Sequence, residues 1–164
     1  MLAIGAVFLV CTACAAGAQA VDRQAPPPTR AEAERLVLRA DDVKRLAEAG
    51  TPGLAEVFRG RALQVLEAQA RALGGRGQRV EERNAMRDLV HWDPGALEAV
   101  LQVASQRRLV TSEGPNPGWA ATVRQWWVRF EFAGGRWWVA DQRDLPPDAW
   151  RPVVRLTGWV HSDI

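Results

Sequence analysis

The chain is poor in the residues from which most catalytic and metal sites are built. Its 164 residues include two cysteines, two histidines and no tyrosine. Cys11 and Cys14 both lie in the first apolar stretch, so the rest of the chain cannot form a disulfide within itself. His91 and His161 lack the close His-x-x-x-His spacing that puts two ligands on one helix face. The sequence therefore predicts no metal site and no cofactor.

Sequence motifs that identify common enzyme classes are also missing. The chain has no Gly-x-Ser-x-Gly turn, no phosphate-binding loop and no dinucleotide fingerprint. The net charge is only +2, and the arginines alternate with acidic residues. A nucleic-acid surface needs clustered, unpaired cations. We therefore expect neither an enzymatic site nor a nucleic-acid partner.

The first twenty residues predict export. Residues 2–16 are nearly all apolar or small, a length that matches the core of a signal peptide and falls short of the roughly 20 residues of a membrane-spanning helix. Ala18 and Ala20 supply the small side chains that a signal peptidase requires. The predicted location is extracytoplasmic, either secreted or lipid-anchored at the cell envelope.

Three fates of this segment, residues 1–20, stay open. Thr12-Ala13-Cys14 is similar to the end of a bacterial lipobox, which makes Cys14 a candidate lipidation site and a link to the membrane, although Cys11 departs from the usual aliphatic residue. The alternatives are simple cleavage after Ala20 or an uncleaved membrane anchor. Residues 21–29 contain three consecutive prolines and are expected to form an extended linker.

After the linker, the sequence first shows two helical patterns. Thr29 and Glu32 fit a capping box at the start of a helix over about 30–49. Thr51-Pro52 predicts the start of a second helix that continues to the glycines at 74–77. Gly60 lies inside this second predicted helix. A glycine within a helix lowers its stability by about 1 kcal/mol relative to alanine, so we expect a kink or a close contact there.

From residue 79 the pattern indicates strands. A long, partly exposed strand is predicted from Arg79 to Trp92 and is followed by a turn at Asp93-Pro94-Gly95. Apolar residues at 97, 99, 101 and 103 alternate with more polar ones, which favours a strand and leaves a helix open as the alternative.

A hairpin with two-residue alternation gives the strongest signal. Its first strand carries Trp126, Val128, Phe130 and Phe132 on one face and Gln125, Trp127, Arg129 and Glu131 on the other. Gly134-Gly135 predicts a tight turn, and residues 136–142 predict the return strand. Helices followed by an antiparallel meander indicate an α+β domain over 30–150, with residues 151–164 as a C-terminal tail.

Three segments carry a resemblance to a known superfamily. Residues 54–63 (LAEVFRGRAL), 126–130 (WWVRF) and 134–139 (GGRWWV) resemble NTF2-like domains similar to the intermembrane-space domain of plastid division proteins. The resemblance implies a cone of N-terminal helices wrapped by a curved antiparallel sheet, as found in bacterial lipoproteins and secreted proteins. It implies no single activity, because this superfamily includes enzymes, ligand binders and interaction modules.

Adjacent tryptophans suggest a binding surface. Neighbouring side chains in a strand point to opposite faces, so we assign Trp126 to the core. Trp127, Arg129 and a tryptophan of the return strand, Trp137, are then expected to form an exposed aromatic and basic surface for a partner. His91 is a candidate for the cone pocket, where some NTF2-like isomerases place a catalytic residue; the alternative is an edge-strand histidine.

Together these features favour a non-enzymatic extracytoplasmic binding or interaction domain of a bacterial protein, tethered to the membrane or released from it. Its expected partner is an envelope protein or a cell-wall component. Two alternatives stay open. One is a small-molecule-binding pocket protein or a SnoaL-like cyclase or isomerase, and the other is a subunit of an envelope secretion or conjugation machine.

Overall fold

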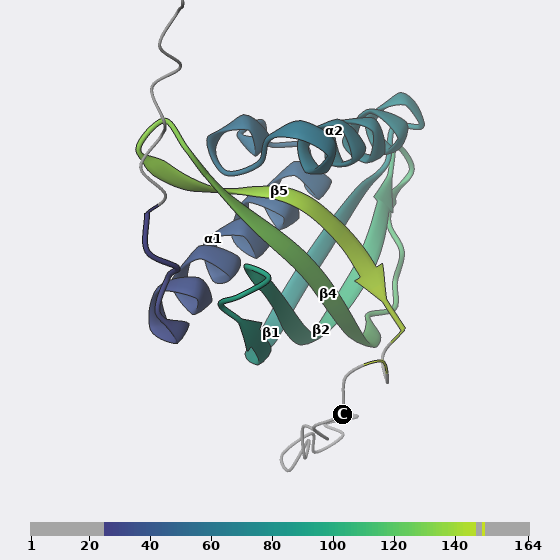
Figure 1. The fold of residues 1–164 in the computed structure, drawn as a ribbon. Helices are drawn as coiled ribbons and strands as arrows, with labels where there is room; N and C mark the ends of the chain where they lie inside the picture. The colour runs from purple at the N-terminus through teal and green to yellow at the C-terminus, as the bar shows by residue number, and fades with distance from the viewer. Residues whose placement is uncertain (1–24, 147–148, 150–164) are drawn as a thin grey trace, which may run out of the picture.

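The computed structural model describes residues 25–146 and 149, with the helices first and an antiparallel sheet after them (Figure 1). This order confirms the predicted α+β class. Cys14, the proposed cleavage point after Ala20 and the tail 151–164 lie outside the described residues. The elements are α1 (Arg30–Glu48), η1 (Leu54–Glu56), α2 (Gly60–Gly75), β1 (Arg79–Asp93), β2 (Glu98–Thr111), β3 (Gly114–Pro115), β4 (Ala120–Ala133) and β5 (Arg136–Leu145).

The sheet has the order β1-β2-β4-β5, with β3 paired to β2, and all these pairings are antiparallel. The predicted strands at 79–92 and 97–103 are therefore confirmed, and the helical alternative for the latter is excluded. Gly134 and Gly135 form the predicted turn with φ of 59° and 78°, values that favour glycine in a two-residue hairpin loop. Register shifts in β1 and β4 bend the sheet.

The capping box at the start of α1 is confirmed. The Thr29 backbone N–H donates to Glu32 Oε2 at 2.8 Å, and the Glu32 backbone N–H donates to Thr29 Oγ1 at 3.3 Å. These two bonds satisfy donors that the first helical turn leaves without partners. From this cap α1 runs without a break to Glu48 and turns Ala33, Val37 and Ala40 toward the sheet.

The predicted helix start at Thr51-Pro52 is wrong. After η1 the chain extends over residues 57–59 and pairs with the edge of β5, where the Arg59 N–H donates to Val139 O at 3.0 Å. α2 begins only at Gly60, whose φ of 54° favours glycine and where an added Cβ would lie 3.6 Å from Ala140 O. Pairing at the sheet edge outweighs the helical pattern here, since it satisfies backbone groups of an otherwise open strand.

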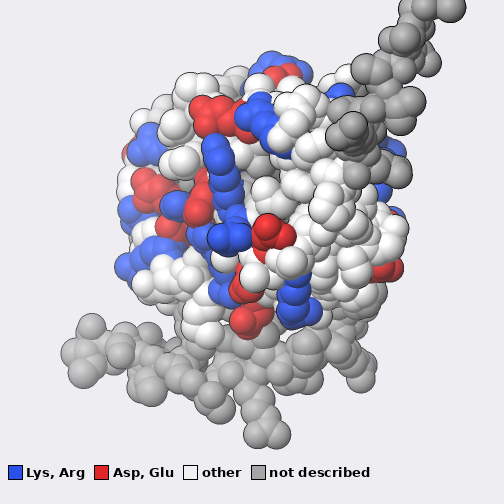
Figure 2. Space-filling view, turned by 60° about the vertical axis from the view of Figure 1, so that its left-hand side comes forward, with Lys and Arg blue, Asp and Glu red and all other residues white. Residues whose placement is uncertain are grey.

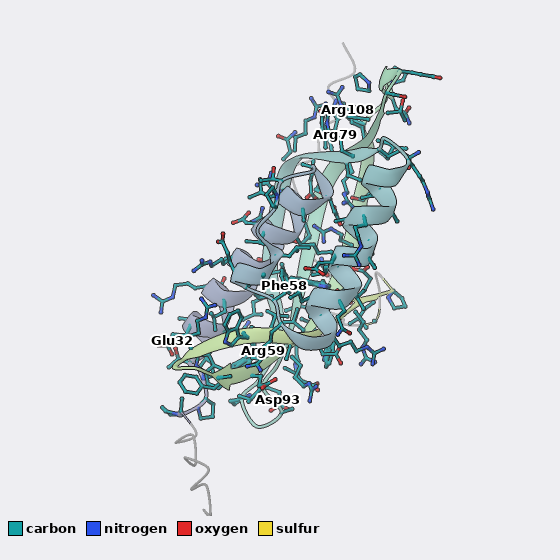
Figure 3. All side chains as sticks on the ribbon, turned by 90° about the horizontal axis from the view of Figure 1, so that it is seen from above. Glu32, Phe58, Arg59, Arg79, Asp93 and Arg108 are labelled. Atoms are coloured by element: carbon teal, nitrogen blue, oxygen red, sulfur yellow. The ribbon has the colours of Figure 1, made fainter. Side chains whose placement is uncertain are left out.

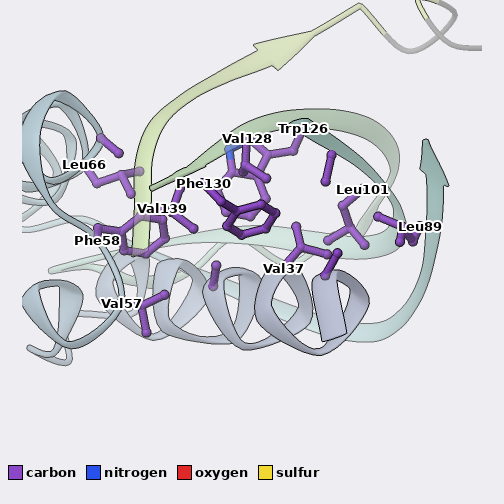
Figure 4. Packing of buried hydrophobic residues seen from close by; sticks show 14 of the residues in the cluster. Val37, Val57, Phe58, Leu66, Leu89, Leu101, Trp126, Val128, Phe130 and Val139 are labelled. Carbon is purple, nitrogen blue, oxygen red and sulfur yellow. The ribbon is translucent and has the colours of Figure 1, made fainter. Parts of the chain in front are cut away.

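The hydrophobic core lies between the helices and one face of the sheet, which we call the inner face (Figure 4). Trp126 is fully buried there, as predicted, and its ring centroid lies 6.1 Å from that of Phe58. Trp92 and Phe130 pack edge to face at 5.9 Å. The other side of the same sheet, which we call the outer face, takes no part in this cluster.

We expect Thr29→Ala to lower the free energy of unfolding by about 1 kcal/mol, because it removes the acceptor of the N-cap. Thr51→Ala is the matched control, since the structure gives Thr51 no capping role. Urea unfolding of the two variants measures the difference. Equal losses would contradict the helix boundaries described here.

The cap also has a pH dependence. The backbone hydrogen bond from Thr29 is the main cause that lowers the pKa of Glu32 below 4.5 in the folded chain. A lowered folded-state pKa stabilises the fold above 4.5, and this contribution is lost as the pH falls through the folded pKa. We expect the stability difference between the natural chain and Glu32→Gln to narrow below pH 4.5. A difference that stays constant from pH 7 to pH 3 would contradict this.

Candidate functional site

A buried charged cluster occupies the inner face beyond the apolar core. Val103 on β2 pairs with Arg87 on β1 and with Arg124 on β4, so the two arginines flank it on neighbouring strands. Asp41 of α1 is fully buried above them. Its carboxylate oxygens lie 3.0 Å from Arg87 Nε and 2.9 Å from Arg124 Nη2. One acidic side chain thus joins the helix to two strands of the sheet, β1 and β4.

A second buried carboxylate extends this cluster along the strands. The side chain of Glu82 is 1% exposed, accepts a hydrogen bond from Ser105 Oγ and lies 3.5 Å from Arg124 Nη2. Burial by itself would lower the pKa of Arg124, but the carboxylates of Asp41 and Glu82 outweigh it and raise that pKa above its ordinary value. Arg124 therefore keeps its charge at any physiological pH.

The cluster matches positive charge with negative charge and offers little for catalysis. Ser105 is fully buried, and its hydroxyl is bonded to a carboxylate that also faces arginines. Over residues 25–146 no group of histidine, cysteine, aspartate and glutamate side chains is placed to hold a metal ion. Orienting α1 on the sheet is the role that this geometry supports. The buried charged cluster and the residues paired with it are Asp41, Asp42, Lys44, Glu48, Glu82, Arg87, Arg107, Arg124 and Asp144.

A hollow of about 340 Å³ opens beside this cluster. Lys44, Glu48, Arg107 and Asp144 are among the residues that line it. His91, the candidate pocket residue, does not line it. His91 pairs with Val100 on β2, and this row belongs to the outer face of the sheet. The described structure thus separates the histidine from the hollow between helices and sheet.

The three residues expected to form one exposed surface lie in two places. Trp127 and Arg129 share the outer face, but Trp127 is only 8% exposed. Its Nε1 donates to Glu98 Oε2 at 3.1 Å, and Arg143 stacks over its ring at 4.6 Å. The expectation that Trp127 is exposed is therefore wrong, because neighbouring strands supply side chains that cover it.

Trp137 lies on the inner side of the sheet, at the hairpin end of the molecule. Its ring packs edge to face on Phe132 with centroids 5.3 Å apart. It lines a hollow of about 590 Å³ together with Pro26 and Pro27, so the end of the proline-rich linker lies against the domain. Trp138 takes the outer position instead, with Arg136 stacked on it at 3.5 Å. Figure 3 shows Asp93 at this same end and Arg79 and Arg108 at the opposite one.

The outer face carries an apolar row that sequence reasoning missed. Met86, Ala104 and Val123 pair across β1, β2 and β4. Met86 is 47% exposed and Val123 36%, values that place them among the exposed large apolar side chains of the described residues. The sequence signal for this row was the two-residue alternation of β2, which continues beyond residue 103. This alternation places small and amide side chains of β2 on the same face as Met86 and Val123.

Next to this row, polar and apolar side chains of the same face are well buried. Gln125 Nε2 donates to Gln102 Oε1 at 2.9 Å, with both side chains nearly inaccessible. Val100 is fully buried, yet neither it nor Ala104 nor Trp127 belongs to the main core cluster. The apolar row and these buried neighbours together define the candidate binding surface.

These features define a small α+β domain in which the described helices pack on one face of the sheet and leave the other without a helix from the same part of the chain. No protein-family model matches the chain, and no curated protein matches its sequence. A solved structure with a similar fold is the crystal structure of the intermembrane space region of the chloroplast protein ARC6. The TM-score is 0.57 at 15% identity, and the match covers 73% of this chain and 98% of that chain. This confirms the predicted similarity in fold to an intermembrane-space domain.

We expect Asp41→Ala to lower the free energy of unfolding by about 3–5 kcal/mol, because Arg87 and Arg124 lose the carboxylate that they share. Asp42→Ala is the control. Its side chain is 47% exposed, so its pair with Arg87 should contribute at most about 1 kcal/mol.

Urea unfolding of both variants tests this, with Asp41→Asn as a milder change if the alanine variant does not fold. Losses of the same size for positions 41 and 42 would contradict the role of the buried cluster.

Proposed function

We propose that the chain is a non-enzymatic interaction domain of the NTF2-like type that acts outside the cytoplasm and binds an envelope protein through the outer face of its sheet. The observation that carries this proposal is the pair of exposed apolar side chains Met86 and Val123, which flank the buried Ala104 in one row of the outer face. An apolar patch of this kind on a soluble domain typically marks a contact surface. Farther along the same face, Arg143 pairs with Trp127 and Arg129 follows it on β4, so polar side chains are available for the rim that such surfaces have.

The charge distribution supports a protein partner. On the face seen in Figure 2, positive and negative side chains are interspersed and form no single-signed stripe. Several arginines are held in pairs, such as Arg108 with Glu81 at 2.7 Å. Binding to phosphate backbones requires cations that are available to the ligand. A contact with mixed charges and an apolar centre fits a folded protein better.

The N-terminal segment supports the location. Its 15-residue apolar run is typical of an export signal, and the lipobox-like Cys14 offers a membrane link. No helix in the described part of the chain is long and apolar enough to cross a bilayer. The structural neighbour is an intermembrane-space region, which supports a role outside the cytoplasm.

Site-specific photo-cross-linking in cells that produce the chain tests this proposal. A benzophenone side chain placed at Val123 should form a discrete adduct with one other protein. The matched control position is Ala68, which is exposed on α2. An adduct from Val123 and none from Ala68 supports the outer face as the binding surface. No adduct from Val123, or the same adducts from both positions, would contradict it.

A small anionic ligand is a second candidate function. The hollow beside Lys44 and Arg107 has room for a few atoms, and buried nitrogens of Arg107 and Arg124 lack a hydrogen-bond partner among the described residues. Native mass spectrometry of the purified chain distinguishes the two functions. A bound small molecule that is lost in Arg107→Gln would favour the pocket over the interaction surface.

A further inference from the structure

The end of the proline-rich linker is held at one place on the domain. Pro28 is buried, and Ala25, Pro26 and Pro27 line the hollow of about 590 Å³ that Trp137 also lines. Because Trp137 directly follows the turn between β4 and β5, the chain enters the domain beside this hairpin. We call this part of the molecule the hairpin end and define it as residues 94–97 and 132–138.

The two turns of the hairpin end carry no charge. Residues 94–97 (PGAL) connect β1 to β2, and residues 132–135 (FAGG) form the tip of the β4–β5 hairpin. Side chains from both turns line the same hollow, so they form one continuous apolar end. The connections at the opposite end of the sheet differ, since they carry Arg76 and Glu113.

Two tryptophans and one arginine complete the hairpin end. Trp137 and Trp138 are half-buried, and they belong to opposite faces of β5. Arg136 is exposed, and its guanidinium lies 3.5 Å from the centre of the Trp138 ring. Tryptophan is enriched at the headgroup level of bilayers, and basic side chains are attracted to anionic lipid surfaces. The side chains of this end therefore match the chemistry of a lipid surface.

The chain length before the domain keeps this end close to any membrane attachment point. Ala25 follows a lipidated Cys14 by eleven positions, which span at most about 40 Å when extended. It follows an anchor that ends at Ala20 by five positions, or at most about 18 Å. The other end of β2 lies about 45 Å farther along the strand. A tether that enters at the hairpin end thus brings this end to the bilayer first.

We propose that the hairpin end binds the surface of an anionic lipid bilayer, with its two tryptophans at headgroup level and Arg136 beside the lipid phosphates. The orientation rests on the membrane link proposed above, whereas the lipid contact itself rests on the described side chains. In this orientation the strands stand away from the membrane. The outer face of the sheet then stays open to a protein partner.

Site-specific fluorescence in the presence of vesicles tests the proposal. Full-length chains with Cys11→Ser and Cys14→Ser receive one new cysteine, either Ala96→Cys or Ser112→Cys. Both positions are exposed turn residues and lie beyond opposite ends of β2, so each serves as the matched control of the other. Each cysteine is labelled with an environment-sensitive dye and mixed with vesicles of phosphatidylcholine and phosphatidylglycerol, with and without a spin-labelled quencher lipid.

We expect the dye at Ala96→Cys to shift its emission to shorter wavelength and to be quenched by the spin-labelled lipid, because it lies in the headgroup region. The dye at Ser112→Cys should show neither change. Equal quenching at the two positions, quenching at Ser112→Cys alone, or quenching at neither would overturn the proposal.

A charge variant tests the role of the arginine. A basic side chain near an anionic surface contributes about 1 kcal/mol, so Arg136→Gln should lower the equilibrium constant for docking about fivefold, read from the quenching at Ala96→Cys. Arg79→Gln is the control, since Arg79 is also exposed but lies at the opposite end. An equal loss in both variants would overturn the proposal, because it would show that overall charge and not the hairpin end drives binding.

This outcome is separable from that of the proposed function. Photo-cross-linking at Val123 reads contact of the outer face with a protein, whereas the dye at residue 96 reads contact of the hairpin end with lipid. Quenching without a protein adduct would support the lipid contact and contradict the partner surface. An adduct without quenching would support the partner surface and contradict the lipid contact.

Discussion

The structure depends on one constraint: the sheet has two faces, and within residues 25–146 helices pack on only one of them. α1 and α2 pack on the inner face and enclose the core around Trp126 and Phe58. Everything distinctive about the other face follows from the lack of a third helical layer in the described residues. Its apolar row, its paired glutamines and its shielded Trp127 are a second, smaller packing surface.

The buried cluster around Asp41 determines how α1 lies on the inner face. Burying charges is costly, and a hydrophobic substitute of the same shape is often at least as stable. Asp41 instead fixes the orientation of α1 on the sheet, since its two carboxylate oxygens contact arginines on two different strands. Val103 alone would let the helix slide or rotate over an apolar surface. The fixed helix in turn gives the sheet its defined inner and outer faces.

The sequence predicts what depends on near neighbours in the chain. The capping box at Thr29, the strand alternation around Trp126 and the Gly134-Gly135 turn could all be identified from local spacing. The extended residues 57–59 could not, because their hydrogen bonds go to Val139, about eighty positions away. Periodicity assigned Trp127 to the correct face. Its burial by Arg143 and Glu98 and the pairing of Asp41 with strand arginines again depend on the tertiary fold.

Nuclear Overhauser contacts in solution test the central claim most directly, since they report which side chains lie on the outer face. In the full chain with labelled valine methyls and tryptophan indoles, we expect contacts from the Val100 methyls to the indole of Trp127, its cross-strand partner on the outer face, and none to the indole of Trp126 on the inner face. Contacts of Val100 with the Trp126 indole would contradict the assignment of the two faces.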